Sequence, residues 1–299
     1  MKGSISGWLC LDKPEGISSN RAMIKVRRIF GEKMGYVGTL DPFATGVLPI
    51  AVGEARKYIK FINESEKLYT FTMVFGQTTD SLDKNGEITE TTNQIPVEKD
   101  IMDVIPEFIG RQKQTPPVFS AVKIHGTRAC DLVRSGKTPI LRPKEIEILE
   151  LRIIGENLRE KRVTLEVLCS KGTYIRGLAR DMAQKLKSLA YVSELRRKRS
   201  GFFSIKDIIS MEKLQKIKDT SDRRNILISI ESPLDDIPAL YLGNEDVARL
   251  RKGLNVLLES LPADALNVRV FDNVQGKFFG VCVLSNNGLL KPARMMAGD

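Results

Sequence analysis

The alternation of apolar and polar residues predicts several strands in the first two-thirds of the chain. Residues 67–75 (KLYTFTMVF) carry an apolar or aromatic side chain at almost every second position, the period of a half-buried strand. Residues 7–12 form a short apolar run that ends at a Lys-Pro-Glu-Gly turn, which also indicates a strand. Two further strands are expected near 145–155 and 161–169.

Helical spacing is clearest just after the first predicted strand. Ser18 and Ser19 offer N-caps to a helix that ends at about Phe30, with apolar residues along one side. A second helix is expected over 176–188, and 97–109 is expected to be partly helical. Because strands and helices do not alternate regularly, the pattern favours an α+β fold over a doubly wound sheet.

The last part of the chain has its own pattern after a Pro- and Asp-rich segment at 232–238. We expect a large N-terminal domain over 1–232 and a small β-rich module over 233–299. The module is predicted to contain one helix (244–252) and two strands (267–272 and 278–284).

The charge is distributed unevenly between these two parts. The chain of 299 residues has 47 Lys and Arg against 37 Asp and Glu, a formal net charge of +10. Residues 235–299 contain 7 basic and 8 acidic residues, so the excess lies entirely in the larger part. A basic large domain favours a polyanionic partner, and nucleic acid is preferred to an anionic membrane because no basic amphipathic helix stands out. A merely soluble basic protein is the alternative on charge alone.

Several classes of protein are disfavoured by the composition. The four cysteines lie far apart and His125 is the only histidine, so neither a zinc site, a disulfide framework nor a Ser-His-Asp hydrolase is expected. The longest uncharged stretch, 278–290, has 13 residues, too few to span a bilayer. We therefore expect a cytoplasmic protein without a membrane segment or a metal.

The densest chemical signal is the loop over 35–49, which has three glycines, two prolines and one carboxylate, Asp41. The proline after Asp41 disfavours a helical backbone at the aspartate. A carboxylate among apolar neighbours is costly without a cation, so a basic partner is expected. An Asp that only caps a turn is an equally weighted alternative.

A second segment, 169–176 (CSKGTYIR), places an aromatic side chain two residues before a guanidinium. If the segment is extended, Tyr174 and Arg176 lie on one face. An aromatic ring beside a guanidinium could bind an unstacked base or pair with a buried aspartate. The simpler alternative is a Tyr and an Arg that pack on the surface at the end of a strand.

Together these motifs closely resemble the bacterial tRNA pseudouridine synthase B family, over roughly residues 7–210. The matching segments are KPEGISS (13–19), GTLDPFATGVL (38–48), SKGTYIR (170–176) and LRR (195–197). The family acts on the uridine at position 55 in the T loop of tRNA. The resemblance implies a pseudouridine synthase fold with a central mixed, largely antiparallel sheet flanked by helices. It also implies an RNA-gripping insertion at about 111–143 and a C-terminal PUA-like RNA-binding module.

The resemblance also implies roles for individual residues. Asp41 would be the catalytic aspartate of an isomerase that detaches uracil, turns it and rejoins it through carbon, without metal or cofactor. The remaining implied site residues are Arg176 as the partner of Asp41, Tyr69 stacked on uracil, Tyr174 and Leu195 lining the base pocket, and Lys57 near the site. The uridine would have to be flipped out of its stack.

Tyr36 departs from the family pattern, which usually has His at this position. A flat phenol can still fill the space left by the extruded base, but a general acid-base role at this position is in doubt. His125 is expected to be a loop residue that is plainly exposed or touches phosphate.

The basic run 196–199 is expected to be a solvated face, with some side chains near the RNA backbone because Leu195 precedes it. The cations near the insertion are expected to position phosphates: Arg111, Lys113, Lys123, Arg128, Arg134 and Lys137.

Two other functions compete with the stand-alone enzyme. One is a non-catalytic tRNA-binding or tRNA-folding protein, which Asp41 disfavours because a carboxylate repels phosphates. The other is the archaeal and eukaryotic relative that works with a guide RNA, which the insertion and the lack of long basic tails disfavour. The expected partner is therefore the tRNA T arm, with no guide RNA and no obligate protein partner.

Overall fold

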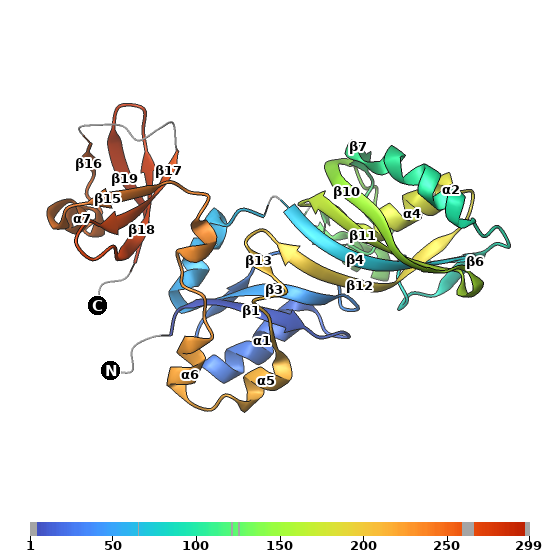
Figure 1. The fold of residues 1–299 in the computed structure, drawn as a ribbon, viewed down its shortest axis with the longest axis horizontal. Coiled ribbons are helices and arrows are strands. Elements are labelled where there is room, and N and C mark those ends of the chain that lie inside the picture. Colours follow the sequence, from blue (N-terminus) through green and yellow to red (C-terminus); the bar gives the residue numbers. More distant parts are fainter. Residues whose placement is uncertain (1–4, 65, 121, 125, 259–265, 297–299) are drawn as a thin grey trace.

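The computed structural model describes residues 5–64, 66–120, 122–124, 126–258 and 266–296. A mixed sheet of ten strands forms the centre of the larger part (Figure 1). Its main order is β14-β1-β3-β12-β4-β11-β10-β7, with β2 paired to β3 and β13 paired to β12. The strands are β1 (Gly7–Lys13), β2 (Met34–Tyr36), β3 (Thr45–Val52), β4 (Glu66–Phe75), β7 (Gly110–Gln114), β10 (Lys144–Asn157), β11 (Arg162–Ser170), β12 (Ala190–Ser200), β13 (Phe203–Ser204) and β14 (Ile209–Ser210).

Most neighbouring strands are antiparallel, as β4 is to both β11 and β12. The pair β12 and β3 is parallel, with Arg196 opposite Thr45 and Arg197 opposite Gly46. This pairing brings the loop that precedes β3 beside a strand some 150 residues later in the chain. The central strands alternate as the sequence predicts: Tyr69 and Phe71 of β4 are buried, and Thr70 between them is half-buried.

Helices cover the sheet and begin where local sequence signals place them. Helix α1 (Ser19–Phe30) is capped by the Ser18 hydroxyl, which accepts a hydrogen bond from the Arg21 amide, and ends at Gly31. One apolar core joins α1 and α4 to strands of the large sheet. Further helical segments outside the insertion and the C-terminal module are η1 (Gly53–Phe61), α2 (Glu98–Val104), η2 (Ile105–Phe108), η3 (Leu158–Glu160), α4 (Ile175–Lys185), α5 (Met211–Lys216), α6 (Thr220–Asn225) and η4 (Ser232–Leu234).

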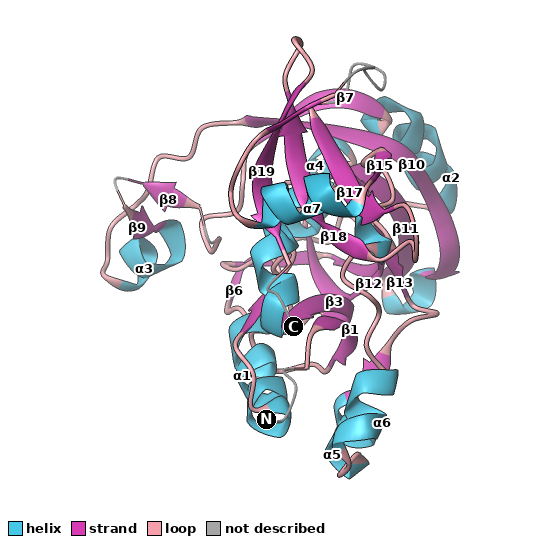
Figure 2. Ribbon diagram, turned by 90° about the vertical axis from the view of Figure 1, so that its left-hand side faces the viewer, coloured by secondary structure: helices cyan, strands magenta, loops and turns pink. Residues whose placement is uncertain are grey.

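Figure 2 shows that the segment between β7 and β10 stands apart from the large sheet, as expected for an insertion. It contains a hairpin of β8 (Lys123–Ile124) and β9 (Thr127–Arg128), followed by α3 (Ala129–Arg134). A second small hairpin, β5 (Gln77–Thr79) with β6 (Ile88–Thr91), follows β4. The first residues of the predicted insertion, 111–114, instead extend the large sheet as strand β7. His125 lies outside the described residues.

In its described residues, the C-terminal module is a five-stranded sheet with one helix, α7 (Asn244–Arg251). Its order is β15 (Ala239–Leu242), β17 (Asn267–Asp272), β18 (Phe278–Leu284), β19 (Leu289–Met295) and β16 (Val256–Leu257). Phe271 and Phe278 of the module share an apolar cluster with Trp8 and Tyr58 of the larger part. The α+β fold with a separate β-rich C-terminal module is confirmed. Within the described residues, no helix combines the length and apolarity needed to cross a bilayer.

Candidate active site

Asp41 lies in a cleft of about 850 Å³ between the loop before β3, the turn after β5 and the insertion. Tyr36, Asp41 and Arg176 all line this cleft, so the structure brings these three predicted residues together. The Ser19 hydroxyl accepts a hydrogen bond from the Leu40 amide (2.8 Å) and donates one to the Leu40 carbonyl (3.0 Å). The start of α1 therefore supports the Asp41 loop directly.

Arg176 is the residue that holds the cleft together. Its side chain is 4% exposed, and its Nε donates to Oδ2 of Asp41 at 2.8 Å. Its Nη1 donates to the Ser81 carbonyl (2.6 Å) and its Nη2 to the Phe119 carbonyl (3.0 Å). One guanidinium thus joins the Asp41 loop, the turn after β5 and the base of the insertion, while 36% of the Asp41 side chain stays exposed.

The strand predicted over 161–169 and the helix predicted from about 176 are both present, so the extended conformation considered for 169–176 does not occur. Strand β11 ends at Ser170, and Arg176 lies in the first turn of α4, with Tyr174 as its N-cap residue. The Thr173 hydroxyl donates to the Ser170 carbonyl and closes a turn that ends the strand. Tyr174 and Arg176 are therefore not related by the two-residue period of a strand.

Asp83 is a second carboxylate on Arg176 that sequence reasoning missed. Its Oδ2 lies 3.5 Å from Nη1 of Arg176, and its Oδ1 accepts hydrogen bonds from the Ser81 hydroxyl and the Asn85 amide. Burial raises the pKa of Asp83, whereas the Asn85 amide and Arg176 oppose the rise. The sequence signal was only a polar turn at 80–86, which does not say which carboxylate is buried.

Lys13, at the end of β1, supports the site from outside the cleft, although sequence reasoning assigned it only to a turn and to the KPEGISS motif. It is fully buried, and its Nζ donates to the carbonyls of Pro14 (2.8 Å), Ile17 (2.7 Å) and Pro42 (3.1 Å). Burial lowers the pKa of Lys13 to about 8, with Asp41 and then Glu15 opposing the change. The bond to Pro42 anchors the residue that directly follows Asp41.

Three predicted base-pocket residues, Tyr69, Tyr174 and Leu195, do not line the Asp41 cleft itself, and Leu195 borders a separate cavity with Phe43. Tyr69 and Leu195 are buried in the same apolar cluster as Leu40 and Phe43, which line the cleft. Burial raises the pKa of Tyr69 and of Tyr174. The backbone of Tyr174 is held at both its N–H and its carbonyl by the Gln114 side chain, at 2.8 and 3.0 Å.

Lys57 does not line this cleft. It lies in η1, where its Nζ pairs with Glu54 at 2.5 Å. The same carboxylate pairs with Arg294 of the C-terminal module at 3.3 Å. The structure thus places Lys57 at the contact between the two parts of the chain.

The basic run 196–199 forms the end of the central strand β12 and is only in part a solvated face: Arg196, Lys198 and Arg199 keep 31–40% of their side chains exposed, and Arg197 does not. Its alternate residues Arg196 and Lys198 pair with Asp12 (2.9 Å) and Glu166 (2.9 Å), and Arg199 pairs with Glu66 (2.9 Å). Arg197 is completely buried between β3 and β4. Three of the four consecutive cations are thus paired with carboxylates, and the buried Arg197 is bound by the backbone carbonyls of Val47 and Gly38.

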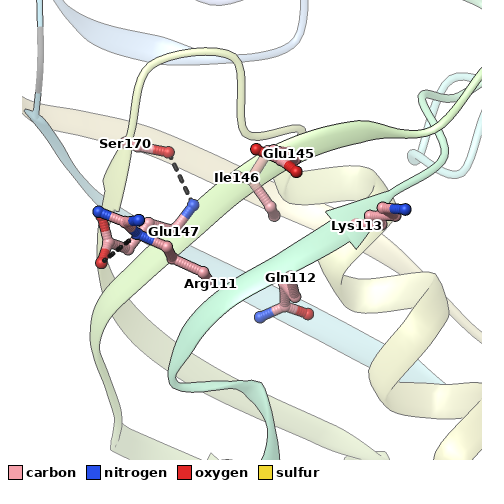
Figure 3. Close-up of a pocket in the computed structure, with 7 residues that line it drawn as sticks. All are labelled: Arg111, Gln112, Lys113, Glu145, Ile146, Glu147 and Ser170. Atoms are coloured by element: carbon pink, nitrogen blue, oxygen red, sulfur yellow. Dashed lines mark hydrogen bonds and ion pairs between the residues drawn. The ribbon is translucent and has the colours of Figure 1, made fainter.

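The cations near the insertion occupy different surroundings. Arg134 lines the cleft together with Asp41. Arg111 and Lys113 instead border a separate cavity of about 460 Å³ at the sheet edge, beside Glu145 and Glu147 (Figure 3). Arg111 pairs with Glu147 at 3.6 Å. These opposite charges make that cavity a weak candidate for phosphates.

The sheet with its C-terminal module, and a cleft that joins Asp41 to a buried arginine, can now be compared with known proteins. A solved structure of an H/ACA ribonucleoprotein bound to a substrate RNA containing 2′-deoxyuridine has the same fold, with a TM-score of 0.72 at 19% identity; the match covers 98% of this chain and 85% of the other. Residues 25–175 match the N-terminal domain of the TruB family of pseudouridylate synthases. Residues 176–236 match the tRNA pseudouridylate synthase B C-terminal domain, and 238–296 match the pseudouridine synthase II TruB C-terminal model. The protein is a pseudouridine synthase.

Individual relatives identify the branch. The tRNA pseudouridine synthase B of Caulobacter vibrioides is 42% identical over 256 residues, covering 85% of this chain and 82% of that protein. The enzyme of the same name from Chelativorans sp. is 37% identical, covering 98% of this chain and 96% of that protein. The chain belongs to the TruB family, the tRNA pseudouridine synthase B enzymes, which are isomerases.

Proposed function

We propose that this enzyme converts uridine 55 in the T loop of tRNA to pseudouridine, acting alone, with Asp41 as its catalytic carboxylate. The observation that carries the proposal is the position of Asp41: one oxygen is bound by a buried arginine, and over a third of the side chain faces an open cleft. A carboxylate that serves as nucleophile or base must be ionised and must reach its substrate. The Arg176 pair supplies a fixed orientation, and the cleft supplies access.

The reaction needs no group beyond the substrate and the side chains. The bond between N1 of uracil and C1′ of the ribose breaks, the base turns, and a bond between C5 and C1′ forms. The C5 proton is then removed, and N1 carries a proton in the product. A stacked uracil cannot reach Asp41, so the base flips into the cleft at a cost of a few kcal/mol.

We assign the base pocket to the residues around the cleft. Tyr69 would stack on the uracil, Tyr174 and Leu195 would line the pocket, and Tyr36 would fill the space left by the base. Lys57 is assigned to the contact with the C-terminal module rather than to the base. Residues 1–232 would form the catalytic domain, and 233–299 would add a PUA-like RNA-binding surface.

The test is a reaction of the purified full chain with an unmodified tRNA transcript and no other RNA, followed by pseudouridine mapping. We expect modification at position 55 of the tRNA and of a T-arm minihelix, and none in a transcript with cytidine at that position. Asp41→Asn should abolish the product and leave tRNA affinity within about three-fold, since the amide is nearly isosteric but neither anionic nor basic. Retention of more than a few per cent of the single-turnover rate by Asp41→Asn would refute the assignment. Tight tRNA binding by the wild-type enzyme without any product would instead support the non-catalytic binding function.

A further inference from the structure

Arg197 occupies an unusual place for a charged residue. It is completely buried in β12, the strand that joins the two halves of the large sheet. In the strand register it stands opposite Gly46 of β3 on one side and Tyr69 of β4 on the other. It therefore lies between the strand that follows Asp41 and the strand that carries the proposed stacking tyrosine.

The hydrogen bonds of Arg197 bracket the Asp41 loop. Its Nε donates to the Val47 carbonyl at 2.8 Å, and its Nη2 donates to the Gly38 carbonyl at 2.8 Å. Gly38 precedes Asp41 by three residues and Val47 follows it by six. One planar group thus ties both ends of the loop to the same point of the sheet.

The third nitrogen of the guanidinium, Nη1, lies close to the backbone of the Asp41 loop. Nη1 is buried and has no hydrogen-bond partner among the described residues. A Cβ added to Gly38 would lie 3.0 Å from Nη1 and 3.2 Å from Nζ of Lys67. The loop backbone therefore packs closely against the guanidinium, and a side chain at Gly38 would require its neighbours to shift by a few tenths of an ångström.

The pairing of β12 with its neighbours does not depend on the Arg197 side chain, because the ladder bonds are made by the backbone. An apolar replacement removes a hydrogen-bond donor from the Val47 and Gly38 carbonyls. The guanidinium's contacts on the loop are two backbone carbonyls, which fix the path of the chain. Its rigid planar fork presents two separate nitrogens, Nε and Nη2, to the two carbonyls in a fixed geometry, which the single Nζ of a lysine does not reproduce.

We propose that Arg197 is a positioning residue for catalysis, which holds the Asp41 loop in register with Tyr69. The inference rests on the proposed role of Asp41. Arg176 fixes the carboxylate itself, and Arg197 fixes the backbone on both sides of it. With Arg197 shortened, the loop loses its anchor to β12, the strand that pairs with β4, and the carboxylate shifts relative to the stacked base.

The variants Arg197→Met and Arg197→Lys test this role, with Lys198→Met as the matched control. Lys198 is the next residue of the same strand, and its Nζ pairs with Glu166. A displacement of about 1 Å in an active site costs roughly 100-fold in rate. We expect a single-turnover rate roughly 100-fold below wild type for Arg197→Met, an intermediate rate for Arg197→Lys, and an unchanged rate for Lys198→Met.

The separation of rate from binding distinguishes positioning from general damage. Filter binding should give tRNA affinities within about three-fold of wild type for both Arg197 variants, and circular dichroism should show folded proteins. If Arg197→Met is unfolded, the single-turnover rate and the tRNA affinity of Arg197→Lys, which keeps the cation, test the inference instead. A rate within about three-fold of wild type in the deciding variant, or a loss of affinity as large as the loss of rate, would overturn the inference. An active Asp41→Asn enzyme would instead overturn the proposed function itself.

Discussion

Replacing Arg176 by alanine removes the group on which three segments of the cleft converge. The substitution frees the Asp41 carboxylate and the carbonyls of Ser81 and Phe119, and it leaves Asp83 buried without its cation. Breaking a buried ion pair from one side costs about 3–5 kcal/mol. Asp41 is 36% exposed, so solvent screens its interaction with Arg176. We therefore expect the free energy of unfolding to fall by about 3 kcal/mol, the low end of this range, mostly because Asp83 is left unpaired.

The catalytic effect of Arg176→Ala should exceed its effect on tRNA binding. An aspartate without its orienting partner reacts from a wrong position, so the single-turnover rate should fall at least roughly 100-fold. Urea unfolding monitored by circular dichroism measures the stability loss, and pseudouridine mapping over time measures the rate. Lys198→Met is the control, since Arg197 of the same run is buried and cannot represent an exposed cation. Arg176→Ala as mild as Lys198→Met in both assays would refute the pairing as the organiser of the site.

The pH dependence gives a further check on Asp83. Burial raises the pKa of Asp83 above its value in the unfolded chain, so the folded protein holds a proton on this carboxyl more readily than the unfolded chain does. The contribution of Asp83 to the free energy of unfolding is therefore lost as the pH rises through the folded pKa. Without Arg176 that pKa rises further. The stability gap between wild type and Arg176→Ala should therefore narrow as the pH is lowered from 7 to 5, and a widening gap would contradict the burial of an unpaired Asp83.

Three other predictions concern the loop and its surroundings. Tyr36→Phe should be nearly neutral and Tyr36→Ala should lose roughly 5- to 150-fold in single-turnover rate, because stacking needs the ring and not the hydroxyl; equal loss in both would show that the phenol matters. Gly46→Ala should destabilise the fold and abolish activity, because its backbone has φ +97° and a Cβ would collide with the Arg197 carbonyl; thermal unfolding and the tRNA assay check this. The pKa of Lys13 is about 8 in the folded protein and 10.5 in the unfolded chain, so the unfolded chain binds more protons between these pH values. Lys13 therefore makes the free energy of unfolding rise with pH over this range. Lys13→Met should lack that rise in urea titrations, and identical pH slopes for the two proteins would contradict it.

Local patterning sufficed for much of the fold. The two-residue period of β4 and the Ser18 cap of α1 were legible because each depends on residues close together in the chain. The small C-terminal module was predicted from a change in charge and a Pro-rich boundary. In the Asp41 loop, glycines, prolines and a lone carboxylate marked a chemical site without its partner.

The resemblance to a known family supplied the partner, Arg176, and the structure places it on Asp41. The resemblance did not indicate the part that Asp83 and Lys13 take in the cleft. Lys13 ends β1 and Asp83 lies in a polar turn of ordinary composition, and only packing shows that both charges are removed from water.

The basic run 196–199 shows most clearly what a linear sequence leaves open. Four consecutive cations predict exposure, since burying a charge without a partner is prohibitive. The partners of Arg197 are carbonyls some 150 residues earlier in the chain, brought close by the parallel pairing of β12 with β3. The sequence by itself thus determined the local strands and helices and the residues that carry the chemistry. Which charges are buried depended on the long-range strand register, because the free-energy cost of burying a cation is set by neighbours that only the folded sheet supplies.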